Sequence, residues 1–424
     1  MPDQKLTTLL KAKQLIDGTG SPVRVDAAIL VVDGAIREIS PQDEISAPPG
    51  CQVVDLGDWT IMPGIVDAHM HFIGLPTDKW QIQAAESDAY RALRAAGEAR
   101  KMLESGVTSA RCLGSSIGPD LRRAIIEGHV PGPRIVAAGE FISSTGGTWD
   151  HITYPLEWIR LQGLIADGVD GVREMVRRRI RQGANVIKVG LSKGVTDDEY
   201  AGWGDDPYEN VASYSAEEVR ALTDEAHRNK LKVSAHCIGD ESVRLALKTG
   251  VDVIEHGYGI SQDTRKMLVD RNILVVTTIC QLYFHLQAID SYHYPAGLRK
   301  IFQRHIDTMR ADFESGLEAG VRFALGTDLT GEPTHPQHMA AKEFELATSW
   351  GMQPMDALAA GTKVSAEALG MDHSIGSLEV GKLADIIGFA GDPVKEIASL
   401  QQVGFVMLGG DVVVNKVNPQ TPLP

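Results

Sequence analysis

Cysteine is scarce in this chain of 424 residues, which has only four, and no two of them form a CxxC pair. A disulfide framework requires an even set of cysteines at regular spacings in a short secreted chain. The cysteines here are widely scattered along a long chain, so we expect no disulfide framework. They are Cys51, Cys112, Cys237 and Cys280.

An excess of positive charge and long apolar runs are also lacking. The formal net charge is −15, whereas a nucleic-acid-binding protein normally carries a basic surface. No apolar stretch approaches the roughly 20 residues that span a bilayer, and the first residues lack the features of a secretory signal. We therefore expect no nucleic-acid partner, no membrane segment and a cytoplasmic location. Apolar residues make up 43% of the chain, which is enough for a large globular core.

Both ends of the chain have the pattern of β-structure. Residues 27–32 and 35–39 are apolar runs, and Asp33-Gly34 between them is a strong hairpin turn. Near the other end, residues 384–389 and 404–408 are apolar runs that are followed by Gly409-Gly410. We expect one small β-sandwich domain that is formed by both termini, residues 1–60 and 371–424.

The middle of the chain, residues 61–370, alternates between apolar strands and amphipathic helices. Near-continuous apolar strands that alternate with helices indicate a parallel sheet, and eight such units indicate a closed (β/α)8 TIM barrel. The overall fold class is therefore α/β. We expect strands at residues 61–68, 107–112, 134–141, 185–189, 232–235, 251–254, 273–278 and 322–325, and helices that include 87–105, 169–182, 215–229 and 298–319.

Six side chains of metal-binding type stand at the C-terminal ends of the expected strands. The first strand ends in an HxH pair, whose side chains share one face because a strand repeats every two residues. Catalytic groups of a (β/α)8 barrel come from these strand ends, and imidazoles and carboxylates that converge form a metal-ligand set. The set comprises His69, His71, Lys188, His236, His256 and Asp328.

Lys188 is the most informative member of this set, because a buried ammonium group costs several kcal/mol. One interpretation is an ion pair with an acidic neighbour, or a side chain that reaches water. The interpretation that we favour is that the amine adds carbon dioxide. The resulting carbamate is an anion that can bridge two cations.

The same residues resemble the amidohydrolase superfamily, in its binuclear subtype with a carboxylated lysine. The resemblance covers essentially the whole chain. Within the superfamily, the chain is most similar to a branch of Xaa-Pro dipeptidases, carboxypeptidases and ochratoxin-hydrolysing amidases, in part because His236 and His256 lie 20 residues apart. The matching segments, besides the six side chains, are residues 17–20 (DGTG), 63–71 (PGIVDAHMH), 213–218 (SYSAEE) and 376–386 (GSLEVGKLADI).

The resemblance implies two divalent metal ions and a mechanism. Zinc is the expected ion for a site rich in nitrogen ligands. The ions would lower the pKa of a shared water, and the resulting hydroxide would attack an amide carbonyl. Asp328 would accept the water's proton and pass it to the leaving amine. His69, His71 and Asp328 would bind the first metal, and His236 and His256 the second, with carboxylated Lys188 as N6-carboxylysine between them.

The resemblance also suggests substrate contacts on the loops after the strands. In that branch a tyrosine and a loop histidine contact the substrate carboxylate. Tyr214 fits the first role, with surface packing as the alternative. Thr148 stands where the histidine is usual, so His151 would replace it, while Trp149 would cap an apolar pocket or pack the loop. His335 would touch substrate or be solvated.

The ligand set leaves more than one reaction open. The preferred substrate is an amide bond of a dipeptide or of an N-acyl or N-aroyl amino acid, ochratoxin A among them. The alternatives are hydrolysis of a cyclic amide, as in imidazolonepropionases and hydantoinases, or of another C–N bond, because function does not follow from fold. A non-enzymatic relative would lack ligands, and none is missing here. A homo-oligomer is expected from the resemblance alone.

We predict that Asp328→Asn keeps the fold and abolishes turnover, because an amide cannot accept and return the proton. Circular dichroism and a hydrolysis assay measure the two effects. Full activity in a folded Asp328→Asn protein would overturn the assigned role.

Overall fold

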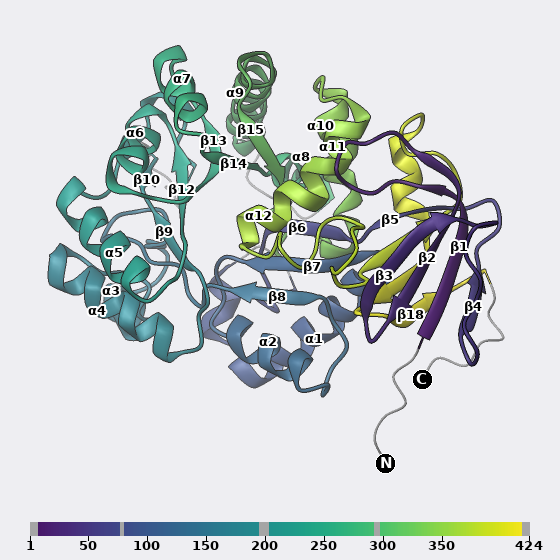
Figure 1. Cartoon of the computed structure of the whole chain (residues 1–424). Helices are drawn as coiled ribbons and strands as arrows, with labels where there is room; N and C mark the ends of the chain where they lie inside the picture. Colours follow the sequence, from purple (N-terminus) through teal and green to yellow (C-terminus); the bar gives the residue numbers. More distant parts are fainter. Residues whose placement is uncertain (1–6, 77–79, 195–202, 292–296, 418–424) are drawn as a thin grey trace.

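The computed structural model describes residues 7–76, 80–194, 203–291 and 297–417. One β-sheet contains strands from both ends of the chain and lies beside a larger α/β part (Figure 1). The division agrees with the α/β class that we expected.

The terminal sheet has eight strands in the order β18-β17-β16-β5-β1-β2-β3, and β4 pairs with β1. Asp33 and Gly34 connect β2 and β3 with φ values of 57° and 79°, as a type I′ hairpin turn requires. The predicted hairpin is therefore confirmed. The strands are β1 (Thr7–Leu15), β2 (Arg24–Val32), β3 (Ala35–Pro41), β4 (Gln52–Asp55), β5 (Thr60–Pro63), β16 (Ile386–Phe389), β17 (Val403–Leu408) and β18 (Asp411–Asn415).

Side chains from the two termini share one core in this sheet. Ile29 of β2 and Phe405 of β17 belong to the same buried apolar cluster, although β2 and β17 are not neighbours in the sheet. Alternate residues of β2, such as Ala28, belong to a second small cluster, as the two-residue period of a strand requires. The observed unit is thus one continuous sheet, and the sandwich remains a prediction.

Eight parallel strands form the central part. We expected them to close into one barrel sheet, but among the described residues they do not. They form a five-stranded sheet, β15-β14-β13-β12-β9, and a three-stranded sheet, β6-β7-β8. Several strands have only four residues, so the ladders end early and only isolated bonds join the sheets, such as Ile142 N to Lys188 O at 3.0 Å. The strands are β6 (Ile65–Met70), β7 (Val107–Cys112), β8 (Arg134–Ala137), β9 (Ile187–Gly190), β12 (Val233–Ile238), β13 (Val253–Tyr258), β14 (Leu274–Thr277) and β15 (Arg322–Leu325).

The prediction of a single strand at residues 61–68 is wrong. The segment divides at Gly64 into β5, which pairs with β16 in the terminal sheet, and β6, which pairs with β7 in the central part. A Cβ atom at Gly64 would lie 2.1 Å from Oγ1 of Thr108, so only glycine allows this close approach. A continuous apolar run conceals the change of sheet, because both halves are buried.

Helices follow most of the central strands, and the expected ones are found within one or two residues of their predicted ends. Ser87 caps α1 by accepting from the backbone N–H of Tyr90, and Ser215 and Glu218 form a capping box at α5. The helices are α1 (Asp88–Glu104), α2 (Gly118–Ile126), α3 (Leu156–Gln162), α4 (Gly168–Arg181), α5 (Ala216–Arg228), α6 (Asp240–Thr249), α7 (Gln262–Asp270), α8 (Ile279–Ser291), α9 (Leu298–Ala319), α10 (Ala341–Ser349), α11 (Pro354–Ala359) and α12 (Ser365–Leu369).

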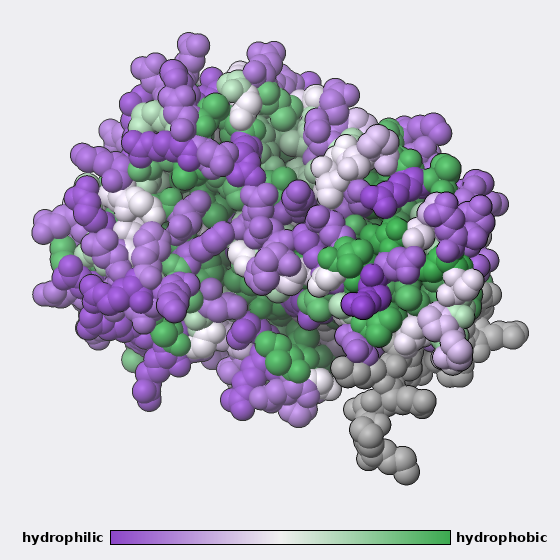
Figure 2. Space-filling view, in the orientation of Figure 1, coloured by the Kyte–Doolittle hydropathy of each residue, from purple (hydrophilic) through white to green (hydrophobic). Residues whose placement is uncertain are grey.

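Hydrophilic residues cover most of the outer helices, and apolar residues show more over the terminal sheet (Figure 2). Val25, Val53 and Val380 are among the exposed large apolar side chains. Among the helices that the structure describes, none combines the length and the apolar character needed to cross a bilayer.

An ion pair joins the terminal sheet to the central part. Arg134, at the start of β8, donates from Nε and Nη2 to the two carboxylate oxygens of Asp385 at 3.0 and 3.2 Å. The same carboxylate accepts from the backbone N–H of Gly409, and the Asp385 carbonyl accepts from Gly64 N. Asp385 therefore holds the point at which the chain changes sheets.

We predict that Asp385→Asn lowers the free energy of unfolding by about 2 kcal/mol, because the half-buried Arg134 loses its counter-charge. Chemical denaturation measures the change. Arg123→Ala, which removes an exposed ion pair with Glu127 on one helix, is the control and should change little. Equal effects of the two substitutions would contradict the role given to Asp385.

Candidate metal centre

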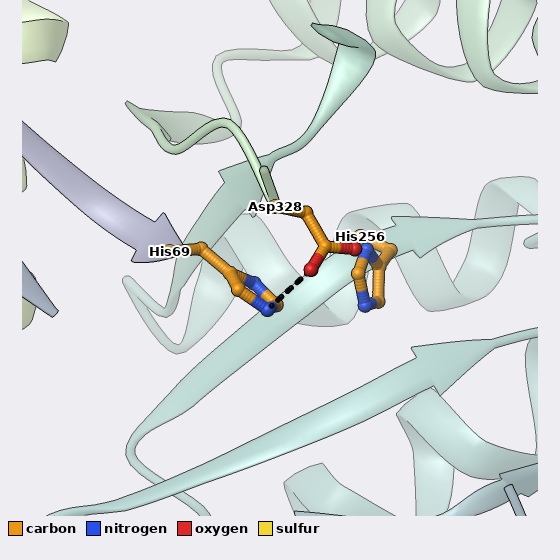
Figure 3. A group of neighbouring side chains, drawn as sticks. All are labelled: His69, His256 and Asp328. Atoms are coloured by element: carbon orange, nitrogen blue, oxygen red, sulfur yellow. Dashed lines mark ion pairs between the residues drawn. The ribbon is translucent and has the colours of Figure 1, made fainter. Parts of the chain in front are cut away.

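The ends of the central strands bring the ligand-type side chains together. One ligand atom each of His69, His256 and Asp328 lies within 4.8 Å of the others, and the three side chains approach from separate elements (Figure 3). The His71 ring centroid lies 5.3 Å from that of His69, and the His236 centroid 4.5 Å from that of His256. The structure thus places both pairs of histidines around Asp328.

Asp67 fixes the HxH pair relative to Asp328. Its carboxylate accepts from the hydroxyl and the backbone N–H of Thr327 at 2.7 and 3.0 Å, and from His69 N at 3.1 Å. His71 N donates to the carbonyl of Leu329. These bonds join the end of β6 to the residues after β15, so the two sheets meet at the ligand set. Burial raises the pKa of Asp67 to about 7, although its hydrogen bonds oppose the shift.

The polar contacts of His69 and His71 show what the centre can hold. The carbonyl of Gly114, 3.0 Å from His71 Nδ1, can only accept, so Nδ1 carries the ring proton. His69 Nδ1 lies 2.8 Å from the Glu255 carboxylate. In the neutral rings both Nε2 atoms are then acceptors, and they face Oδ1 of Asp328 at 3.3 Å for His69 and 2.8 Å for His71. Acceptors this close repel one another unless a cation lies among them, so the set fits a divalent metal ion.

The backbone at two ligand-type residues is strained. His256 and Asp328 have φ values of 69° and 55°, in the left-handed region that L-residues with side chains rarely adopt. Such residues cost about 1–3 kcal/mol and persist only where their surroundings hold them. His256 Nδ1 lies 2.8 Å from Oγ1 of Thr278, which orients its ring. The fold therefore contains backbone strain at two residues whose side chains point into the centre.

Lys188 of β9 is buried in the same place. Its side chain is 1% exposed, and Nζ has no hydrogen-bond partner among the described residues. The aromatic ring of Phe141 lies 5.4 Å from Nζ. Burial lowers the pKa of Lys188 to about 8, although Glu255 and Asp328 oppose the shift. The ion pair that we left open as an alternative is not found among the described residues.

Glu255 is a functional residue that the sequence analysis missed. Its fully buried carboxylate contacts His69, accepts from Arg111 Nη2 at 2.6 Å and accepts from the Ser234 hydroxyl. Arg111 donates also to the carbonyl of Ala68 at 2.6 Å. Burial alone would raise the pKa of Glu255, but Arg111 and His69 outweigh it and lower the pKa to about 2. The one available signal was an acidic residue inside an apolar strand.

Comparison with known proteins agrees with this geometry. The profile of the amidohydrolase family matches residues 60–413. The chain belongs to the amidohydrolase family. It is 30% identical to ochratoxinase from Aspergillus niger, over 94% of this chain and 84% of that protein.

Solved structures place this amidohydrolase beside the same relatives. A Xaa-Pro dipeptidase with bound methionine matches with a TM-score of 0.86 and 29% identity, over 96% of this chain and all of that one. Ochratoxinase from A. niger matches with a TM-score of 0.85 and 28% identity, over 97% and 96% of the two chains. These relatives confirm the expected branch of the superfamily, and the protein is a hydrolase of carbon–nitrogen bonds.

Tyr214 of this amidohydrolase lies in the core and not on the surface. Its hydroxyl donates to the carbonyl of Ala166 at 2.8 Å, and its ring belongs to the apolar cluster around α4 and α5. Burial raises the pKa of Tyr214 well above its usual range. Among the described residues, no contact joins Tyr214 to the ligand set, so these contacts favour packing over the predicted substrate role.

Trp149 and His151 lie beside the centre. The Trp149 ring stacks on Phe141 at 4.9 Å and lies nearly parallel to His71 at 6.0 Å, and His151 lies 5.1 Å from Trp149. Burial lowers the pKa of His151 to about 4, so its ring is neutral at pH 7. Trp149 is partly exposed, and its position is compatible with the predicted contact to substrate.

His335 is not solvated, contrary to one of the alternatives that we left open. It is 1% exposed, and its ring lies 4.4 Å from that of His285. Burial lowers the pKa of His335 to about 4, against a smaller opposing effect of Asp328. The backbone N–H of His335 donates to the carbonyl of Gly331, three residues after Asp328, and its substrate role remains a prediction.

We predict that Glu255→Gln weakens metal binding about 10–100-fold, because a carboxylate beside a ligating histidine orients its ring and Glu255 contacts His69. It should also destabilise the fold by about 3–5 kcal/mol, since buried Arg111 loses its counter-charge. Zinc titration against a competing chelator measures the first effect and thermal unfolding the second.

The control for Glu255→Gln is Glu343→Gln on α10, which removes another buried carboxylate. Glu343 accepts from the backbone N–H groups of Ile279 and Cys280. The Glu343→Gln protein should lose stability and keep its zinc affinity. Adding Arg111→Met to Glu255→Gln should restore stability but not zinc affinity. Unchanged zinc affinity in Glu255→Gln would refute the orienting role.

Proposed function

We propose that this amidohydrolase is a metal-dependent enzyme that cleaves the peptide-like amide bond of dipeptides or of N-acyl and N-aroyl amino acids, with ochratoxin A as one candidate. The observation that carries the proposal is the approach of the Asp328 carboxylate to the Nε2 atoms of His69 and His71. The similarity to ochratoxinase and to a Xaa-Pro dipeptidase supports the substrate class.

The ligand assignment follows the resemblance and the observed distances. When bound, two divalent cations, for which zinc is our proposal, supply a water of lowered pKa and polarise the scissile carbonyl. His69, His71 and Asp328 would hold the first ion, and His236 and His256 the second. Lys188, as a carbamate, would lie between them.

Formation of the carbamate uses the buried amine of Lys188. The neutral nitrogen attacks carbon dioxide, a C–N bond forms, and one proton is released. The product is an anion in place of an ammonium group, which fits a place that is surrounded by histidines and has no hydrogen-bond acceptor for Nζ among the described residues. Burial favours the neutral amine that this reaction requires.

Asp328 would transfer the proton during hydrolysis. Its carboxylate lies at the centre of the ligand set, where it would accept a proton from the attacking water and return it to the amide nitrogen as the C–N bond breaks. An amide nitrogen is a poor leaving group without this proton. When a cation is bound, its charge would keep the Asp328 carboxylate ionised as it enters the reaction.

A hydrolysis screen of zinc-loaded protein tests the function. We predict chelator-sensitive cleavage of compounds with a free carboxylate next to the amide, in a panel of Xaa-Pro and Xaa-Phe dipeptides, N-aroyl amino acids including ochratoxin A, and cyclic amides. Chromatography of the products measures cleavage, and zinc addition after chelation should restore it. Cleavage of cyclic amides alone would keep the metal chemistry and refute the substrate class.

The carbamate has a test of its own. Protein equilibrated with 13C-bicarbonate should give a carbamate carbon signal in the NMR spectrum, and Lys188→Ala should lose both this signal and turnover. Lys193→Ala, which removes an exposed lysine five positions later, is the control and should keep both. A fully active Lys188→Ala protein would exclude a bridging carbamate.

A further inference from the structure

A second tryptophan, Trp203, lies beside the metal centre. Its ring centroid is 6.4 Å from that of His256, with an angle of 57° between the planes, and its side chain is partly exposed. Trp149 approaches His71 in a comparable way. Two partly exposed indoles therefore flank different histidines of the ligand set.

The position of Trp203 is fixed by the strand that carries His256. His305 Nε2 donates to the carbonyl of Gly204 at 2.9 Å, since a carbonyl can only accept. His305 Nδ1 is then an acceptor, and the hydroxyl of Tyr258 on β13 donates to it at 2.8 Å. Asn210 Nδ2 donates to the Trp203 carbonyl at 3.0 Å. His305 is fully buried and connects Trp203 to β13.

The indole of Trp203 has no parallel ring against it in the described part of the chain. His285 and His305 both meet it at 89°, and Phe302 meets it at 78°. These pairs are T-shaped, whereas Trp149 is already stacked on Phe141 at 22°. The exposed part of the Trp203 side chain is not stacked on a described ring, so it can take an offset-stacked aromatic ring.

The wall formed by Trp203, His285, Phe302 and His335 carries no positive charge. His285 stacks on Phe302 at 4.6 Å and meets His335 at 4.4 Å. Burial lowers the pKa of both histidines below the usual range, despite the nearby Asp328. A carboxylate bound against this wall would meet neutral rings and the Asp328 charge. An uncharged aromatic group would lose little hydration free energy on leaving water.

We propose that Trp203 is a stacking platform for an uncharged aromatic ring of the substrate, beside His256. The inference rests on the proposed amide-hydrolase function and narrows its substrate class to aryl amides. The substrate carboxylate, in an N-aroyl amino acid, then lies away from this wall.

The test is equilibrium binding of 4-fluorobenzamide, followed by 19F NMR, to metal-loaded and to chelator-treated protein. Trp203→Ala should weaken binding at least about tenfold in both forms, and Trp203→Phe should stay within about threefold of the original chain. In the chelator-treated form 4-fluorobenzoate should bind at least about tenfold more weakly than the amide, because its negative charge would meet neutral rings and the Asp328 carboxylate. Cyclohexanecarboxamide should bind more weakly than 4-fluorobenzamide.

The matched control is Trp158→Ala, because Trp158 stacks on Tyr154 at 4.2 Å, outside the wall. It should bind like the original chain, and circular dichroism shows whether each variant is folded. Equal binding by folded Trp203→Ala, or a preference for benzoate, would overturn the proposal. Binding is measured without turnover, so the two proposals can fail separately. If binding depends on Trp203 but the hydrolysis screen finds no cleavage, the proposed function is refuted and the stacking role of Trp203 remains.

Discussion

The buried carboxylate of Glu255 joins the two central sheets where the ligand set lies. Glu255 is on β13, while its partners Arg111 and His69 are on β7 and β6 of the other sheet. Through His69 it fixes which ring nitrogen faces Asp328, and through Arg111 it neutralises a guanidinium group that is buried with it. The geometry of the proposed metal centre therefore depends on a residue that need not touch a metal ion.

A buried ion pair of this kind does not by itself stabilise a fold, because the desolvation of two charges offsets their attraction. Its value here lies in orientation. A histidine that binds a metal needs one protonation state and one ring orientation. A carboxylate next to the ring nitrogen that does not bind the metal provides both. Asp67 acts in a similar way on the backbone, because it binds Thr327 and so sets the distance between the HxH pair and Asp328. The strained φ values at His256 and Asp328 are consistent with a centre held by many surrounding bonds.

The side chains around the ligand set are of two kinds, charged and aromatic. Glu255 contacts His69, whereas tryptophan rings lie near His71 and His256. Trp149 approaches the HxH pair and Trp203 approaches His256, so a substrate would meet aromatic surface on more than one side. Tyr214, which the resemblance suggested as a substrate contact, is instead bonded within the core. Recognition in this protein is therefore better sought among its tryptophans.

The sequence by itself determined the α/β class and the terminal hairpin, and it predicted the six candidate ligand positions. Each of these depends on local periodicity, since a strand's alternation and its end decide which side chains reach the same edge. Tertiary structure alone decided the split of residues 61–68 at Gly64, the two central sheets, the burial of Tyr214 and the contacts of Glu255 and Trp203. Arg111 and Glu255 are 144 positions apart, and Trp203 is held through His305. Such contacts follow from how distant elements pack, and no local pattern encodes them.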